Sequence, residues 1–219
     1  MSETPLYGYK YADIFVSTKS EIMKKLKLQM QLSVDGFVSS GNGKSSDWMV
    51  WDFGENWAWD KDLQEYHTSL TASIDTVLLS RKMAEGGFID HWADMAVNTN
   101  SPQSAFARNI THARKVVVTQ KLDKSIWNNT ELAKGDLVTE VNKLKAQSGK
   151  DIIVYGGAGF VSALIKERLI DEYHLVINPA ILGYGVPIFN EISSRQDLQL
   201  ISAKSYDKGM VVLIYAAIL

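Results

Sequence analysis

The alternation of apolar and polar residues first indicates a β-strand close to residue 26. From Leu26 to Val34 every second residue is apolar and the residues between them are polar. A period of two is typical of a strand with one buried face. Later apolar runs, each too short for a helix, predict further strands at residues 74–79, 115–119, 151–155 and 173–177.

Helical patterns separate these predicted strands. Residues 60–73 have the composition of a helix, and Asp60 is a candidate for its cap. The other elements are predicted as a helix at 104–112, an amphipathic helix that carries Leu137, Val141 and Leu144 and is ended by Gly149, an irregular segment at 86–103, and a C-terminal hairpin of strands 198–206 and 210–218.

A glycine-rich turn follows the apolar run Asp151–Tyr155. The sequence Gly156-Gly157-Ala158-Gly159 leads directly into a helical pattern, so strand, tight turn and helix follow one another. Glycines allow positive φ and let a ligand approach the main chain, and the N–H groups that begin the helix suit a pyrophosphate. The alternative is that the glycines serve only the turn.

Composition narrows the classes of partner. The 219 residues fit one domain, and a net charge of −2 gives no field that would attract nucleic acid or an anionic membrane, which leaves a small molecule as the expected partner. No apolar run approaches the roughly 20 residues of a membrane span. The absence of cysteine excludes a thiol nucleophile and cysteine-ligated zinc, and it is compatible with the cytoplasm. His91 has no partner at metal-ligand spacing, so no metal site is expected.

Two segments flank the first predicted strand. Residues 1–21 contain aromatic residues without a clear period and are interpreted as an N-terminal arm outside a core domain of residues 22–219. Residues 39–47 form a glycine- and serine-rich loop that would suit a lid. After it come Trp48, Trp51, Trp57 and Trp59, which either stack on a planar ligand or supply core and interface packing.

Several motifs occur together in one order. They are Ser33-Val34-Asp35-Gly36, Ser80-Arg81 at a strand end, Val116–Thr119, Tyr155-Gly156-Gly157-Ala158-Gly159, Leu169–Tyr173 and Gly183–Phe189. In this combination residues 25–219 resemble the dihydrofolate reductase-like superfamily, and within it the C-terminal reductase domain of the bifunctional riboflavin-biosynthesis protein. The zinc deaminase domain of that protein has no counterpart here, and Tyr155 stands where the riboflavin-pathway reductases often have glutamate.

The resemblance implies an α/β, three-layer fold: a mixed, mainly parallel sheet with helices on both faces and an antiparallel C-terminal hairpin. It also implies a homodimer and NADPH as cofactor. The tryptophan-rich segment and the hairpin are the candidate dimer contacts. The residues that match the family's cofactor site are Ser80, Arg81, Lys82, Thr119, Gln120, Lys121, Gly156, Gly157, Ala158, Gly159, Phe160 and Val161.

Two functions are compatible with these features. The first is an NADPH-dependent reductase that transfers hydride to a small heterocyclic substrate, pterin- or aminopyrimidine-like, with Asp35 or Tyr155 as the catalytic residue that provides the proton. The second is a non-catalytic nucleotide-binding or sensor protein that keeps the fold.

Overall fold

The computed structural model describes residues 23–40, 48–49 and 60–218. The predicted arm, most of the 39–47 loop, Trp51, Trp57 and Trp59 lie outside the described residues.

A sheet of eight strands forms the centre of the molecule, in the order β5-β4-β3-β6-β1-β7-β10-β9. All neighbouring pairs from β5 to β7 are parallel, and β10 runs antiparallel to both β7 and β9. The strands are β1 (Leu26–Leu32), β3 (Ile74–Ser80), β4 (Arg114–Val118), β5 (Thr130–Ala133), β6 (Asp151–Tyr155), β7 (Glu172–Ile177), β9 (Leu198–Ser205) and β10 (Val211–Ala217).

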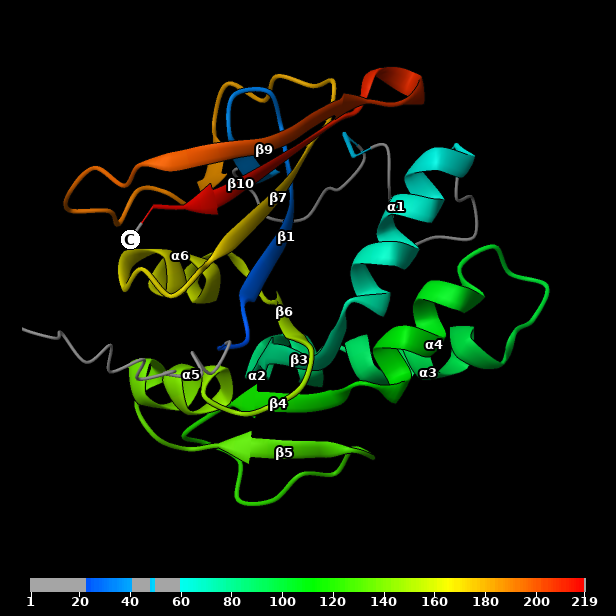
Figure 1. Cartoon of the computed structure of the whole chain (residues 1–219), viewed down its shortest axis with the longest axis vertical. Coiled ribbons are helices and arrows are strands. Elements are labelled where there is room, and N and C mark those ends of the chain that lie inside the picture. Colours follow the sequence, from blue (N-terminus) through cyan, green and yellow to red (C-terminus); the bar gives the residue numbers. More distant parts are fainter. Residues whose placement is uncertain (1–22, 41–47, 50–59, 219) are drawn as a thin grey trace, which may run out of the picture.

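Helices cover both faces of this sheet (Figure 1). One hydrophobic core lies between the sheet and the helices α1 to α4, and the other lies between the sheet and α5 and α6. The helices are α1 (Lys61–Ala72), α2 (Arg81–Glu85), α3 (Phe88–Val97), α4 (Ser104–His112), α5 (Leu137–Lys145) and α6 (Ala158–Lys166). The structure confirms the predicted three-layer α/β fold, with its mainly parallel sheet and its antiparallel C-terminal hairpin.

Side-chain hydrogen bonds fix the start of α1 and the turn between β9 and β10. Asp60 caps α1 as predicted, because its carboxylate accepts from the Leu63 N–H at 2.6 Å. The hairpin of β9 and β10 turns through η1 (Asp207–Gly209), where the Asp207 N–H donates to Asp60. A separate ribbon of β2 (Phe37–Ser40) and β8 (Gly185–Pro187) pairs two loops that follow β1 and β7.

Three sequence-based expectations need correction. The segment 86–103, predicted as irregular, contains α3, because Phe88, Ile89 and Trp92 share one helical face and pack into the core. α5 ends at Lys145, four residues before Gly149. The polar face of β1 is not solvated, since Lys27, Gln29 and Gln31 are all less than a tenth exposed.

No helix in the described part of the chain has both the length and the apolar character needed to cross a bilayer.

Candidate functional site

The sequence-predicted cofactor residues lie along one edge of the sheet. Residues 156–161 follow β6, residues 80–82 follow β3 and residues 119–121 follow β4, and these strands are parallel neighbours. Their register aligns Leu79 with Tyr155 and Ser80 with Val118, so the carboxyl ends are level. At roughly 5 Å between strands, the three segments form one row about 10 Å long. The carboxyl edge of an open α/β sheet is where such folds bind ligands.

The glycine turn between β6 and α6 has an extended backbone. Gly157, the cap residue of α6, has φ −70° and ψ 165°, and none of the glycines at 156, 157 and 159 has positive φ. The prediction of positive φ in this turn was wrong. Gly156 is required by packing, because a Cβ there would lie 2.5 Å from the Phe160 ring.

Gly157 has no such internal reason to be glycine. Its backbone conformation suits any residue, and a Cβ at this position would meet no atom of the described residues within 4 Å. The same holds for a Cβ at Gly159. The first N–H groups of α6 have no partner inside the helix, and Phe160 and Val161 donate to the Gly157 carbonyl. A ligand phosphate can therefore approach this main chain closely, and the residues present fit a dinucleotide pyrophosphate.

Beside the turn, Ser80 ends β3 and caps α2. Its hydroxyl accepts from the Met83 N–H at 3.2 Å. Arg81 forms an ion pair with Glu85 one helical turn away, and Lys82 is exposed. Ser80 therefore has a local structural role, whereas Lys82 presents its ammonium to the surface at the strand end.

After β4, Thr119 orders the next segment. Its buried hydroxyl accepts from the N–H groups of Lys121, at 3.0 Å, and Leu122, at 3.3 Å. The Gln120 side chain donates to the Lys134 carbonyl, and Lys121 is exposed. Lys121 is thus a second surface cation on the same row.

Asp35 connects two loops. Its carboxylate accepts from the Ser33 hydroxyl at 2.6 Å and from the N–H groups of Leu182 and Gly183. The hydrogen bond from Ser33 is the main cause that lowers the pKa of the Asp35 carboxyl, so this group is ionised near neutral pH. Its role as a proton source stays a prediction, and its visible role is to hold the 182–183 loop against the turn after β1.

A chamber of about 390 Å³ opens beside the glycine turn. Gln29 and Gln31 from β1, Tyr155 from β6 and Val176 from β7 contribute to its sheet side, and the turn itself lines one end. The remaining wall side chains are almost all apolar: Leu28, Met30, Val38, Ser39, Met49, Met83, Phe88, Trp92, Phe106, Val154, Ala158, Val161 and Val186. The chamber thus brings together residues from most of the length of the chain.

Aromatic rings make up the α3 and α4 side of the chamber. Trp92 and Phe106 lie edge to face with ring centroids 4.7 Å apart. Phe88 packs on the ring of Tyr155 at 5.0 Å. These contacts fix the rings in place and give the wall an apolar, preformed surface.

Tyr155 is the predicted catalytic residue that does line the chamber. Its hydroxyl donates to the Gln29 Oε1 at 2.7 Å, and the Gln29 amide nitrogen contacts the His67 Nδ1. Burial raises the pKa of Tyr155, so its hydroxyl stays protonated. Burial also lowers the pKa of His67 well below its usual range, which makes the imidazole a neutral acceptor for the amide.

A row of polar side chains continues beneath α1, away from the chamber. The Tyr66 hydroxyl contacts the His174 Nδ1 at 2.6 Å, and the His174 Nε2 contacts the Glu172 carboxylate at 2.7 Å. Because a carboxylate only accepts, Nε2 carries the proton, and Nδ1 accepts from Tyr66. Lys27 pairs with Asp151 at 2.9 Å and lies 4.0 Å from Glu172.

Apart from Tyr155 and the glycine turn, the residues of the chamber and the polar side chains beneath α1 were not predicted from the sequence. Gln29, Gln31, Phe88, Phe106 and Val176 come from segments with no shared motif. One signal was available in the first strand. A strand in the middle of a parallel sheet is buried on both faces, so polar residues at every second position are unusual there. Lys27, Gln29 and Gln31 fit that description.

The strand order, the single antiparallel strand β10 and the glycine turn define a dihydrofolate reductase-like fold of the type found in riboflavin-biosynthesis reductases. The family model for the RibD C-terminal domain matches residues 24–212, and the chain belongs to this family.

Relatives and solved structures agree with this assignment. The chain is 28% identical to the protein YyaP of Bacillus subtilis (strain 168) over 193 residues, which covers 88% of this chain and 94% of YyaP. A putative riboflavin biosynthesis protein from Shewanella sp. PV-4 superposes with a TM-score of 0.64 at 19% identity, covering 89% of this chain and 99% of that one. The riboflavin biosynthesis reductase Rib7 of Saccharomyces cerevisiae gives a TM-score of 0.53 at 15% identity, covering 92% and 93%. These likenesses support the fold.

Proposed function

We propose that this chain is an NADPH-dependent reductase of a small heterocyclic substrate of the pterin or aminopyrimidine kind. The reductase activity is supported by membership of the RibD C-terminal domain family and by the likeness to a yeast structure titled as a riboflavin biosynthesis reductase. When bound, NADPH supplies the hydride, and the protein contributes binding, orientation and a proton.

The single observation that carries this proposal is the open space beside Gly157. Neither backbone conformation nor internal packing explains glycine at this position, whereas a bound pyrophosphate does. The turn also lines the chamber, so one molecule that rests on the α6 N-terminus extends directly into the cavity.

The surrounding residues have distinct proposed roles. The main-chain N–H groups of Ala158 and Gly159, at the start of α6, hold the pyrophosphate, and the rest of segment 156–161 shapes the turn around it. Lys82 and Lys121 lie on the adenosine side of the row, where an exposed ammonium favours a cofactor with a 2′-phosphate. Tyr155, at the border between the turn and the chamber, keeps a protonated hydroxyl within the wall.

The test is a titration of purified protein with NADPH and, separately, NADH, carried out on wild type, Gly157→Ala and Gly157→Val. We expect wild type to bind NADPH more tightly than NADH. A methyl group at position 157 fills space that only the ligand would occupy, so Gly157→Ala should weaken NADPH binding about tenfold, and Gly157→Val should weaken it further.

The melting temperature provides the control, because among the described residues no atom lies within 4 Å of an added Cβ, and the two variants should unfold close to wild type. Equal NADPH affinity of all three well-folded proteins would contradict the proposal. NADPH binding that is never followed by cofactor oxidation, with pterins, aminopyrimidines and aryl ketones all supplied, would support a non-catalytic nucleotide-binding protein instead.

A further inference from the structure

We infer that the chamber takes an uncharged, unphosphorylated planar ring, and that a ribosyl-phosphate substrate is excluded from it. This inference rests on the proposed function and specifies its substrate. The Thermotoga maritima structure that superposes with a TM-score of 0.59 is titled as a deaminase and 5-amino-6-(5-phosphoribosylamino)uracil reductase, so its named substrate carries a phosphate.

The first support is the chemistry of the wall. Among the described residues that line the chamber, none has a charged side chain. Met83, Phe88, Trp92, Phe106 and Val176 line it with apolar side chains, against which the faces of a flat ring can pack. A phosphate placed here would lose its hydration without gaining a cation.

The second support is that the polar groups of the wall are already engaged. Gln29 accepts from the Tyr155 hydroxyl and contacts His67 through its amide nitrogen. Gln31 accepts from the Asn178 amide at 3.1 Å. A ribose and its phosphate would have to break these hydrogen bonds to make their own, whereas a flat ring that packs by its faces leaves them intact.

The third support is the arrangement of nearby cations. The Lys27 ammonium, on the same face of β1 as Gln29, pairs with Asp151 at 2.9 Å and donates to Ser73 at 3.0 Å. Arg81, just outside, pairs with Glu85. Each is held by its own carboxylate, and the exposed Lys82 and Lys121 lie on the cofactor row rather than in the chamber wall.

The experiment compares two ligands of matched shape. 2-Acetylnaphthalene is neutral and 2-naphthoate carries one negative charge on the same bicyclic ring. Their dissociation constants are measured by calorimetry on the protein without cofactor and again with saturating NADP⁺. We expect the neutral ligand to bind at least about tenfold more tightly, and 5-amino-6-(5-phosphoribosylamino)uracil to show no binding.

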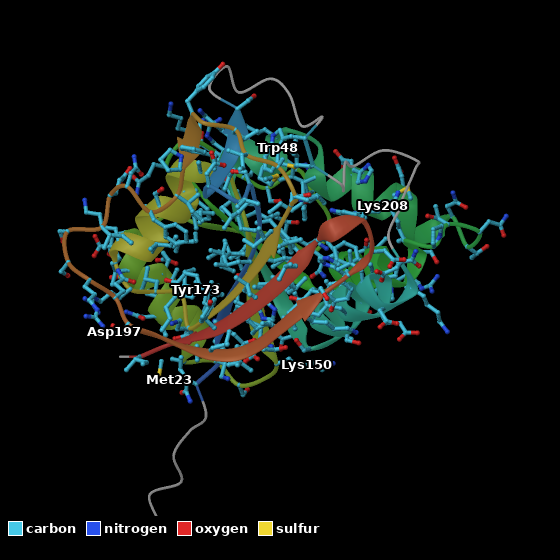
Figure 2. All side chains as sticks on the ribbon, turned by 90° about the horizontal axis from the view of Figure 1, so that it is seen from above. Met23, Trp48, Lys150, Tyr173, Asp197 and Lys208 are labelled. Atoms are coloured by element: carbon cyan, nitrogen blue, oxygen red, sulfur yellow. The ribbon has the colours of Figure 1, made fainter. Side chains whose placement is uncertain are left out.

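A charge placed in the wall should reverse this preference. Met83→Lys introduces an ammonium into the chamber and should weaken the neutral ligand while strengthening 2-naphthoate. Met23→Lys is the matched control, because Met23 is exposed just before β1. It lies on the side of the molecule opposite Trp48, which is the neighbour of the chamber residue Met49 (Figure 2). This control should keep the wild-type order.

The outcomes separate the two proposals. Tighter binding of 2-naphthoate or of the ribosyl phosphate by wild type would overturn the inference without any need for a variant, and so would absence of binding by 2-acetylnaphthalene. The separate NADPH titration of wild type and the Gly157 variants would still test the proposed cofactor site in that case. If the protein binds 2-acetylnaphthalene but not NADPH, the result supports the proposed ligand of the chamber and contradicts the proposed reductase function.

Discussion

Tyr155 is the residue at which the cofactor row meets the chamber. It is the last residue of β6, and Gly156 follows it directly. Its hydroxyl donates to Gln29, and its ring packs against Phe88. Because burial raises its pKa, this hydroxyl remains a hydrogen donor throughout the neutral range. In the structure this hydroxyl fixes the Gln29 amide, and as the proposed proton donor it has to release Gln29 and turn toward the substrate.

Replacing Tyr155 with phenylalanine tests both roles. The lost hydrogen bond to Gln29 should lower the free energy of unfolding by about 1 kcal/mol, measured by urea denaturation. Turnover on an accepted ring substrate should fall by about 100-fold, as expected when a proton-donating group is removed. NADPH affinity should not change, because the proposed pyrophosphate contacts are made by the main chain of the glycine turn.

Tyr173→Phe is the control for this substitution. Tyr173 is also a buried tyrosine, but it lies on the other face of the sheet, in the core under α5 and α6. Its removal should leave turnover at the wild-type level. If Tyr155→Phe also turned over normally, another group would have to be the proton source, and Asp35→Asn would be the next variant to assay.

Among the elements, β1 departs most from its sequence pattern. Its alternation suggested one buried and one solvated face, yet Lys27, Gln29 and Gln31 are all buried. Lys27 pairs with Asp151 at the start of β6, Gln29 contacts His67 on α1, and Gln31 accepts from Asn178, the residue after β7, so protein groups replace water as their partners. The strand thereby contributes to the chamber at its carboxyl end and to an ionic cluster at its amino end.

That ionic cluster predicts a specific pH dependence of stability. The hydrogen bond from His174, with smaller contributions from Lys27 and Lys25, lowers the pKa of the Glu172 carboxyl from 4.5 to about 2. A carboxyl whose pKa is lower in the folded protein stabilises it above the unfolded pKa. This stabilisation is lost as the pH falls from about 4.5 to about 2.

Glu172→Gln should therefore remove a part of the acid sensitivity. We expect the free energy of unfolding at pH 6 to fall by roughly 2 kcal/mol, allowing for solvent screening, with the difference from wild type shrinking toward pH 2. Glu131→Gln, at an exposed pair with Arg114, is the control and should change the curve little. Parallel curves for wild type and Glu172→Gln would show that Glu172 does not titrate as inferred.

The elements differ in how far the sequence predicts them. The apolar runs of β3, β4, β6 and β7 and the glycine turn are local signals, so the sequence predicts these strands and the turn, whereas the short edge strand β5 was not predicted. α3 was missed because Gly86 and Gly87 suggested a loop, although Gly87, at φ 91°, only precedes the helix. The chamber was missed because Gln29, Phe106 and Val176 meet only after the strands are ordered, and no local pattern records that order.

At the scale of the whole molecule, the described residues leave the β9 edge of the sheet uncovered. β9 is the last strand of the sheet, beside β10 (Figure 1). All eight of its residues are exposed, including Leu198, Leu200 and Ile201. Ile218, just after β10, is also about half exposed. An edge strand with this apolar character tends to pair with another chain. A second copy related by a two-fold axis would cover both edges with the same residues, so we propose a homodimer through β9.

Light scattering on purified protein checks this prediction, with an expected mass of two chains. Leu200→Lys places a charge in the centre of the contact without disturbing the core, because Leu200 is already more than half exposed, and it should weaken the dimer at least about tenfold. Val97→Lys, at an exposed aliphatic residue at the end of α3, is the matched control and should remain dimeric.

Tyr184→Lys tests a competing dimer contact, the exposed apolar residues Tyr184, Val34 and Ile181. If Tyr184→Lys alone dissociates the dimer, or if wild type has the mass of a monomer, β9 is not the contact. The aliphatic side chains of β9 would then face water in the native protein.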